Sequence, residues 1–159
     1  MKTLFSILLI SLFFMSSGCG QTQPNQEQTQ TSKKFPLYKP NSEWKKILSP
    51  TTYEVMVNKG TEPAFNNPYN SLYQKGIYVS AATGEPLFSS DDKYDSGTGW
   101  PSFTKPINPQ AVIVIKENSN EVIEAKTGLH LGHVFNDGPV DKGGKRYCMN
   151  SAALKFIKK

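Results

Sequence analysis

The stretch GGKRYCMNSAALKF, residues 143–156, contains the strand candidate KRYCMN and the start of a second one, LKFIKK. Side chains of a β-strand point alternately to its two faces. Arg146, Cys148 and Asn150 therefore share one face of KRYCMN, and the residues between them read as core. A cysteine in this place is either a half-buried bystander or a reactive thiol, because a nearby guanidinium favours the nucleophilic thiolate.

Five further runs upstream have the same short, alternating character and are separated by turns rich in Gly, Pro and Asn. They are GIYVSAA (76–82), EPLFSS (85–90), AVIVIKE (111–117), EVIEAKT (121–127) and LHLGHVF (129–135). Two short helices precede them. Ser42 is the expected cap of SEWKKIL, and Ser49 followed by Pro50 is a typical start for the second helix. The sequence predicts a mainly β domain of antiparallel strands with short helices at its front.

The N-terminus has the pattern of an export signal. Lys2 is followed by the apolar run LFSILLISLFFM and by the small residues of SSGCG. This run is shorter than the roughly 20 apolar residues that a membrane span needs. We therefore expect residues 1–18 to be a signal peptide that directs the chain to the bacterial cell envelope.

Cys19 follows Ser17 and Gly18, an arrangement that resembles the lipobox of bacterial lipoproteins. Lipid on Cys19 would anchor the protein to a membrane; ordinary secretion is the alternative. Residues 19–34 are rich in Gln and Thr and are expected to form a flexible tether. Residues 35–159 then form one domain, which is long enough to build its own core.

Charge and cysteine content narrow the possible functions. The chain carries 18 basic and 13 acidic residues, a net charge of +5, but the charges are interspersed. Without a basic face or a base-stacking aromatic pattern, a nucleic-acid partner is not expected.

The only cysteines are Cys19 and Cys148. If Cys19 carries lipid, Cys148 has no partner in the mature chain and is flagged as a reactive thiol.

Both histidines of the chain lie in one predicted strand, HLGHVF. His130 and His133 would face opposite sides of a regular strand. A β-bulge at Gly132 would bring both imidazoles to one cleft. Metal binding is the rival, but two nitrogen ligands and no Cys-x-x-Cys pair fall short of the four ligands of a structural zinc site. We expect no metal.

The segment DSGTGWPSF, residues 95–103, reads as a bent loop that presents the indole of Trp100. Such an indole either covers the core or forms an apolar wall for a small non-polar group.

Four motifs together resemble one family. They are GTEPAF (60–65), GEPLFSSDDKYDSGTGWPSF (84–103), GLHLGHVFNDGP (128–139) and RYCMNSAALKF (146–156). They resemble the peptide-methionine (R)-S-oxide reductases, the B-type methionine sulfoxide reductases, over about residues 44–156. The resemblance implies two antiparallel β-sheets with short N-terminal helices. It also implies an oxidoreductase that repairs oxidised proteins under oxidative stress.

The resemblance implies a role for each matching residue. Cys148 corresponds to the nucleophile, which attacks the sulfoxide sulfur and becomes a sulfenic acid. The other implied roles are sulfoxide binding and protonation (His130 and His133), orientation of the site or tuning of the thiol (Asn150, Arg146 and Asp137), and the methyl pocket (Trp100, supported by Phe135).

Two departures from the family bear on cofactors and partners. The zinc-ligating cysteines of many relatives are replaced here by Ser80, Thr83, Glu124 and Thr127. No zinc or other cofactor is therefore expected. Lys59 stands where many relatives have a resolving cysteine, so an external thiol, such as a thioredoxin-like protein, is expected to reduce the sulfenic acid.

Two other readings remain open from the sequence. A Cys-His hydrolase or transferase would use Cys148 with one histidine and would have no need of Trp100. A non-catalytic binding lipoprotein would have kept the fold alone.

Overall fold

The computed structural model of the chain describes residues 34–117 and 119–159. The expected signal peptide, Cys19 and nearly all of the expected tether lie outside these residues. Within the described ranges, no helix has both the length and the apolar character needed to cross a membrane.

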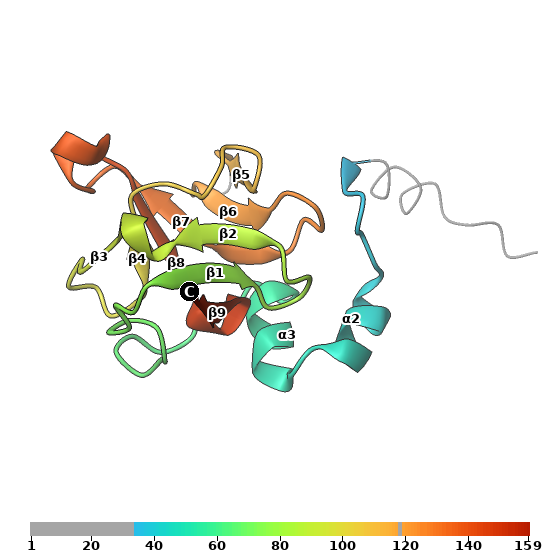
Figure 1. Ribbon diagram of the computed structural model, residues 1–159. Helices are drawn as coiled ribbons and strands as arrows, with labels where there is room; N and C mark the ends of the chain where they lie inside the picture. Colours follow the sequence, from blue (N-terminus) through green and yellow to red (C-terminus); the bar gives the residue numbers. More distant parts are fainter. Residues whose placement is uncertain (1–33, 118) are drawn as a thin grey trace, which may run out of the picture.

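Two antiparallel sheets make up most of the described chain (Figure 1). The smaller sheet has the order β2-β1-β9, and the larger one has the order β3-β4-β8-β7-β6-β5. The strands are β1 (Gly76–Ser80), β2 (Pro86–Ser89), β3 (Lys93–Tyr94), β4 (Ser102–Phe103), β5 (Val112–Ile115), β6 (Glu121–Glu124), β7 (His130–Phe135), β8 (Arg146–Met149) and β9 (Leu154–Lys158). The predicted mainly β architecture of two antiparallel sheets with short helices in front is confirmed.

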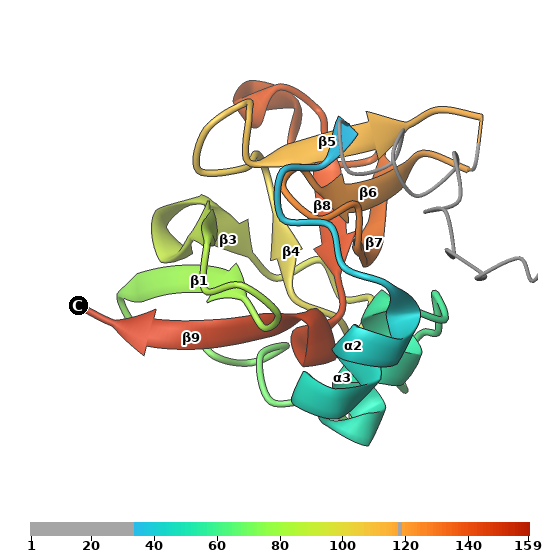
Figure 2. The same cartoon turned by 90° about the vertical axis from the view of Figure 1, so that its right-hand side faces the viewer.

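Helices α2 (Asn41–Ile47) and α3 (Pro50–Met56) precede the strands, and three 3-10 turns connect strands: η1 (Ser90–Asp92), η2 (Val140–Lys142) and η3 (Ser151–Ala153). Figure 2 shows α2 and α3 beside η3, at the end of the molecule where β9 begins.

Only one of the two expected helix caps forms. The Ser49 side chain accepts a hydrogen bond from the Thr52 amide, with Pro50 as the first helical residue. The expectation for Ser42 is wrong: α2 begins one residue earlier, at Asn41, after Pro40. The backbone of Pro40 accepts from the Glu43 and Trp44 amides, so the helix starts without a side-chain cap.

Aromatic side chains join the two sheets. Tyr78 of β1 meets Phe103 of β4 edge to face, with ring centroids 5.0 Å apart. Phe103 also stacks on Phe88 of β2 at 4.5 Å. All three are fully buried, so the short strand β4 is held by packing against the smaller sheet.

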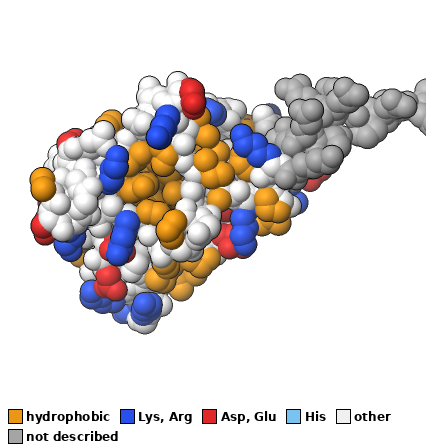
Figure 3. Space-filling view, turned by 90° about the horizontal axis from the view of Figure 1, so that it is seen from above, with side chains coloured by type: hydrophobic (Ala, Val, Ile, Leu, Met, Phe, Trp, Pro, Cys, Tyr) orange, Lys and Arg blue, Asp and Glu red, His pale blue; other side chains and the backbone are white. Residues whose placement is uncertain are grey.

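The surface seen in Figure 3 carries hydrophobic side chains at its centre, with lysine, arginine and acidic side chains scattered around them. Because charges of both signs are mixed on this face, it has no continuous basic surface of the kind that nucleic acid requires.

Candidate active site

Three neighbouring strands of the larger sheet bring polar side chains to Cys148. In the strand register, Cys148 of β8 pairs with Ser102 of β4 on one side and with His133 of β7 on the other. Directly opposed residues project to the same face of a sheet. The thiol therefore lies between a hydroxyl and an imidazole.

A bulge in β7 brings the two histidines together. Val122 of β6 pairs with Gly132, but the next residue, Ile123, pairs with His130, so Leu131 is the extra residue. The rings of His130 and His133 consequently lie 5.2 Å apart between centroids. The predicted bulge is confirmed. A Cβ on Gly132 would come within 2.2 Å of the Cys148 carbonyl oxygen, which explains why glycine occupies this position.

A pocket opens above Cys148. Its volume is about 150 Å³, which is enough for a ligand of about the size of benzene or for the end of a side chain. The lining residues are Thr61, Trp100, Gly132, His133, Phe135, Cys148, Met149 and Asn150.

The thiol is partly buried, and burial raises the pKa of Cys148 above its ordinary value. Contacts with Thr98, Arg146 and Ser102 oppose this rise without cancelling it. From the sequence, Arg146 is expected to favour the thiolate. The guanidinium does so, but the loss of hydration in the buried position is the larger effect, so the resting residue is a thiol.

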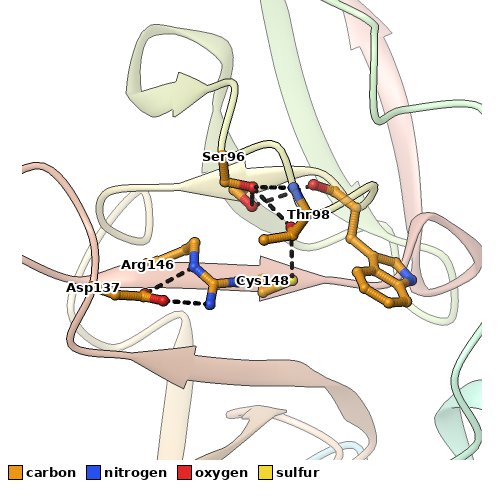
Figure 4. A network of polar contacts seen from close by, with 7 residues as sticks. Ser96, Thr98, Asp137, Arg146 and Cys148 are labelled. Atoms are coloured by element: carbon orange, nitrogen blue, oxygen red, sulfur yellow. Dashed lines mark hydrogen bonds and ion pairs between the residues drawn. The ribbon is translucent and has the colours of Figure 1, made fainter. Parts of the chain in front are cut away.

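Arg146 is held in place beside Cys148. Its Nε and Nη2 atoms donate to the two carboxylate oxygens of Asp137, each at 2.8 Å (Figure 4). Its guanidinium also lies 4.3 Å from the centre of the Phe135 ring. Such a two-pronged ion pair fixes the orientation of the cation more firmly than a single contact. Phe135 thus lines the pocket and packs against Arg146.

His130 lies behind His133 and does not line the pocket. It is only 2% exposed, and its Nδ1 atom lies 2.9 Å from Glu121 Oε1. Burial lowers the pKa of His130 although Glu121 acts in the opposite direction, so the ring is neutral at pH 7. A neutral ring that donates Nδ1–H to a carboxylate presents a bare Nε2 atom. Lys59 closes this chain of contacts with its Nζ atom 2.9 Å from Glu121 Oε2.

Glu62 organises the other wall of the pocket. Its backbone carbonyl accepts a 3.0 Å hydrogen bond from the Trp100 indole, and its amide donates to Asn150 Oδ1 at 3.2 Å. Its buried carboxylate accepts from the amides of Ser151 and Ala152. Asn150 Nδ2 in turn donates to the Leu131 carbonyl at 3.1 Å. The amide of Asn150 is therefore used to hold strands and loop together around the pocket.

The structure thus brings the expected site residues together in and around one pocket. Cys148, His133, Trp100, Phe135 and Asn150 line the pocket. Arg146, Asp137 and His130 stand behind these residues.

Sequence reasoning missed four residues of this region: Glu62, Thr98, Glu121 and Lys59 in its contact with Glu121. The partners of Glu62 lie 38 to 90 positions away in the chain, and only the tertiary fold brings them together. Glu121 is the first residue of β6, nine positions before His130, and its place in the run EVIE offers no local signal of this contact.

Four residues, at the positions where the resemblance implies lost zinc ligands, form a hydrogen-bonded group, here called the hydroxyl–carboxylate clasp: Ser80, Thr83, Glu124 and Thr127. The hydroxyl of Thr83 donates to Glu124 Oε1, and that of Thr127 donates to Oε2 at 2.7 Å. The Ser80 hydroxyl oxygen accepts from the amides of Ala82 and Thr83. Glu124 is fully buried, and both of its oxygens are already engaged.

This donor set does not fit zinc, which binds thiolate and imidazole in structural sites. Among the described residues, no group of three or more His, Cys, Asp or Glu side chains is placed to hold a metal ion.

A thiol beside an imidazole in a small pocket is the arrangement that an enzyme with a cysteine nucleophile uses. Residues 48–158 match the SelR domain. The chain therefore belongs to the SelR family, the B-type methionine-R-sulfoxide reductases, which are oxidoreductases that act on oxidised methionine in proteins and need a reductant.

Proposed function

We propose that the protein reduces the R epimer of methionine sulfoxide in proteins through direct attack of Cys148 on the sulfoxide sulfur. The observation that carries this proposal is the convergence of Cys148, His133 and Trp100 on one pocket of side-chain size. The indole offers an apolar wall for the S-methyl group, and His133 is the pocket-lining group able to give a proton to the sulfoxide oxygen.

In the reductive step, a bond forms between Cys148 Sγ and the substrate sulfur while the oxygen is protonated. The substrate S–O bond and the new S–S bond then break as the oxygen passes to the cysteine sulfur. Methionine leaves, reduced by two electrons, and Cys148 becomes a sulfenic acid, oxidised by two electrons. No atom is left over, because the cysteine takes the oxygen that the substrate gives up.

We infer that an external thiol then regenerates the enzyme. Cys148 is the only cysteine after Cys19. A first external thiol would form a mixed disulfide with Cys148 and release water, and a second would restore the free cysteine. A thioredoxin-like protein or a small thiol has the required chemistry. The clasp supports the accompanying proposal that the domain works without bound zinc.

We also propose that the protein is anchored in the bacterial cell envelope by lipid on Cys19, with residues 1–18 removed and 19–34 acting as a tether to the domain of 35–159. The support is the sequence pattern alone. Replacing Cys19 by alanine should move the protein from the membrane fraction to the soluble one; an unchanged distribution would contradict lipid anchoring.

The reaction is tested by turnover of the separated R and S epimers with dithiothreitol as the reductant. We expect reduction of the R epimer only, and none by a Cys148→Ser variant. An acyl ester offered to the same preparation separates this activity from that of a Cys-His hydrolase. Hydrolysis of the ester without reduction of either epimer would overturn the proposal.

A further inference from the structure

A chain of three hydroxyl groups leads from Cys148 into the loop that carries Trp100. Thr98 Oγ1 lies 3.9 Å from Cys148 Sγ and 2.8 Å from Ser96 Oγ. Ser96 Oγ lies 2.7 Å from Ser102 Oγ, which donates to the Trp100 carbonyl at 3.2 Å. Figure 4 shows Ser96 and Thr98 on one side of Cys148 and the pair of Arg146 and Asp137 farther along the strand.

The direction of each hydrogen bond in this chain follows from its last member. A carbonyl oxygen only accepts, so Ser102 uses its single hydrogen on Trp100. Ser96 must then donate to Ser102, and Thr98 must donate to Ser96. Thr98 has no second hydrogen, so in the contact with Cys148 the sulfur is the donor. This direction requires the thiol form, which is also the form that burial of Cys148 favours.

Ionisation of Cys148 reverses the requirement, because a thiolate only accepts. Thr98 then turns its hydrogen to the sulfur, Ser96 donates to Thr98, and Ser102, whose hydroxyl also contacts the sulfur, donates to Ser96. Every contact of the chain keeps one hydrogen except the 3.2 Å contact with the Trp100 carbonyl, the longest between oxygen atoms. A charged sulfur is also a stronger acceptor than a neutral one. The reversed chain therefore stabilises the thiolate and loses only the hydrogen bond from Ser102 to the Trp100 carbonyl.

The loop geometry is built to present this hydroxyl. Gly97 and Gly99 flank Thr98, and both have positive φ angles, +70° and +89°. The Gly99 position is also closed to larger residues, because a Cβ there would come within 2.7 Å of the Phe65 amide nitrogen. Phe65 N donates to the Gly99 carbonyl at 2.8 Å, which ties this loop to the segment that contains Phe65.

We propose that Thr98 is a further catalytic residue, whose hydroxyl accepts from the Cys148 thiol and donates to its thiolate, and that Ser96 is a positioning residue acting through Thr98. The inference rests on the proposed function only in taking Cys148 as the nucleophile. The role of Thr98 is to make ionisation of Cys148 easier, because burial disfavours the anionic form of this thiol.

The test is the pKa of Cys148, measured from the pH dependence of its alkylation by iodoacetamide in the absence of substrate. Peptide mass spectrometry separates alkylation of Cys148 from that of Cys19. Thr98→Val keeps the shape and removes the hydroxyl, whereas Thr98→Ser keeps the hydroxyl and removes the methyl group. We expect Thr98→Val to raise the pKa of Cys148 by about one unit, a roughly tenfold loss of thiolate at a pH below the pKa. Thr98→Ser should stay within about twofold of the parent, as a hydroxyl role requires.

Thr104→Val is the matched control, since Thr104 is a buried threonine near this loop whose hydroxyl contacts the Asp92 carbonyl. It should leave the alkylation profile unchanged. Ser96→Ala should shift the pKa of Cys148 in the same direction as Thr98→Val, and the double variant should shift it no further than Thr98→Val alone.

Equal profiles for Thr98→Val and the parent, or equal shifts for the valine and serine variants, would overturn the role of Thr98. Additive shifts would overturn the positioning role of Ser96. Because the measurement needs no turnover, its failure is distinguishable from failure of the sulfoxide reductase proposal, which concerns methionine formation.

Discussion

At Cys148, burial and hydrogen bonding act in opposite directions on the ionisation of the thiol. Burial raises the pKa, and the hydroxyls of Thr98 and Ser102 together with Arg146 lower it. A resting thiol resists alkylation and oxidation by small molecules, because the thiolate is the reactive form. Reaction with a bound substrate then depends on a neighbouring group that favours ionisation of Cys148.

The two histidines differ in what they can contribute. His133 lines the pocket, whereas His130 is buried, neutral and hydrogen-bonded through Nδ1 to Glu121. A general acid contributes typically 10²- to 10⁴-fold to a rate. We therefore expect His133→Gln to lower kcat by about 10²-fold or more, with the substrate still bound.

His130→Gln serves as the comparison in the same assay. It should act mainly by displacing its neighbour, with a smaller loss of kcat and a loss of thermal stability because the buried contact between His130 and Glu121 is removed. Measured kcat values for the two variants, at a pH where both proteins are folded, check this order. A larger loss of kcat in His130→Gln would contradict the assignment of His133 as the acid.

At the scale of elements, the two sheets are joined by the clasp as well as by the aromatic core. Ser80 and Thr83 belong to the β1–β2 hairpin of the smaller sheet, and Glu124 and Thr127 to the β6–β7 hairpin of the larger one. The hydrogen bond from Thr83 to Glu124 therefore connects the sheets directly. A buried carboxylate with both oxygens satisfied can stabilise such a junction, whereas one with a missing partner destabilises it.

Thr127→Val should consequently lower the free energy of unfolding by about 1–3 kcal/mol, since it leaves Glu124 Oε2 without its hydroxyl donor. Urea denaturation measures the change. Thr51→Val, at an exposed position of α3, is the control and should stay within about 0.5 kcal/mol of the parent. Neither EDTA nor added zinc should shift the midpoint; a fall in the midpoint on treatment with EDTA would show that the protein does depend on a metal.

The strands that a sequence reveals are those with an alternating pattern long enough to read. All seven expected strands are present, but β3 and β4 were missed. Each has only two residues, and the segment around them reads as a loop because of Gly97, Gly99 and Pro101. β4 is nevertheless the strand that brings Ser102 to Cys148. Its position depends on the packing of Phe103 against the other sheet, which no local pattern encodes.

For the candidate site, the sequence identified the reacting side chains but not what holds them. Cys148, His133 and Trp100 stood out because thiol, imidazole and indole are rare and chemically distinctive. Glu62 and Thr98 are common residue types in loops, and their roles come from contacts made across the fold. The change of register near Gly132 was predictable from two histidines three residues apart, but the expectation that both would reach one cleft is wrong, because His130 is buried and only His133 lines the pocket.

Within the whole molecule, the two packed sheets form the domain that holds Cys148 in its pocket. Cys148 is the only cysteine among the described residues, so its oxidised form has no partner thiol in that part of the chain. The cycle therefore divides into oxygen transfer at the pocket and reduction by a thiol from outside. The two halves are separable by leaving out the reductant.

A single turnover without reductant tests the central claim most directly. The protein is mixed with an equimolar peptide carrying the R epimer of methionine sulfoxide, followed by dimedone, and Cys148 is examined by mass spectrometry. We expect one methionine formed per protein and a dimedone adduct on Cys148, both abolished when the S epimer is used. Methionine formed without modification of Cys148, or formed equally by Cys148→Ser, would contradict it.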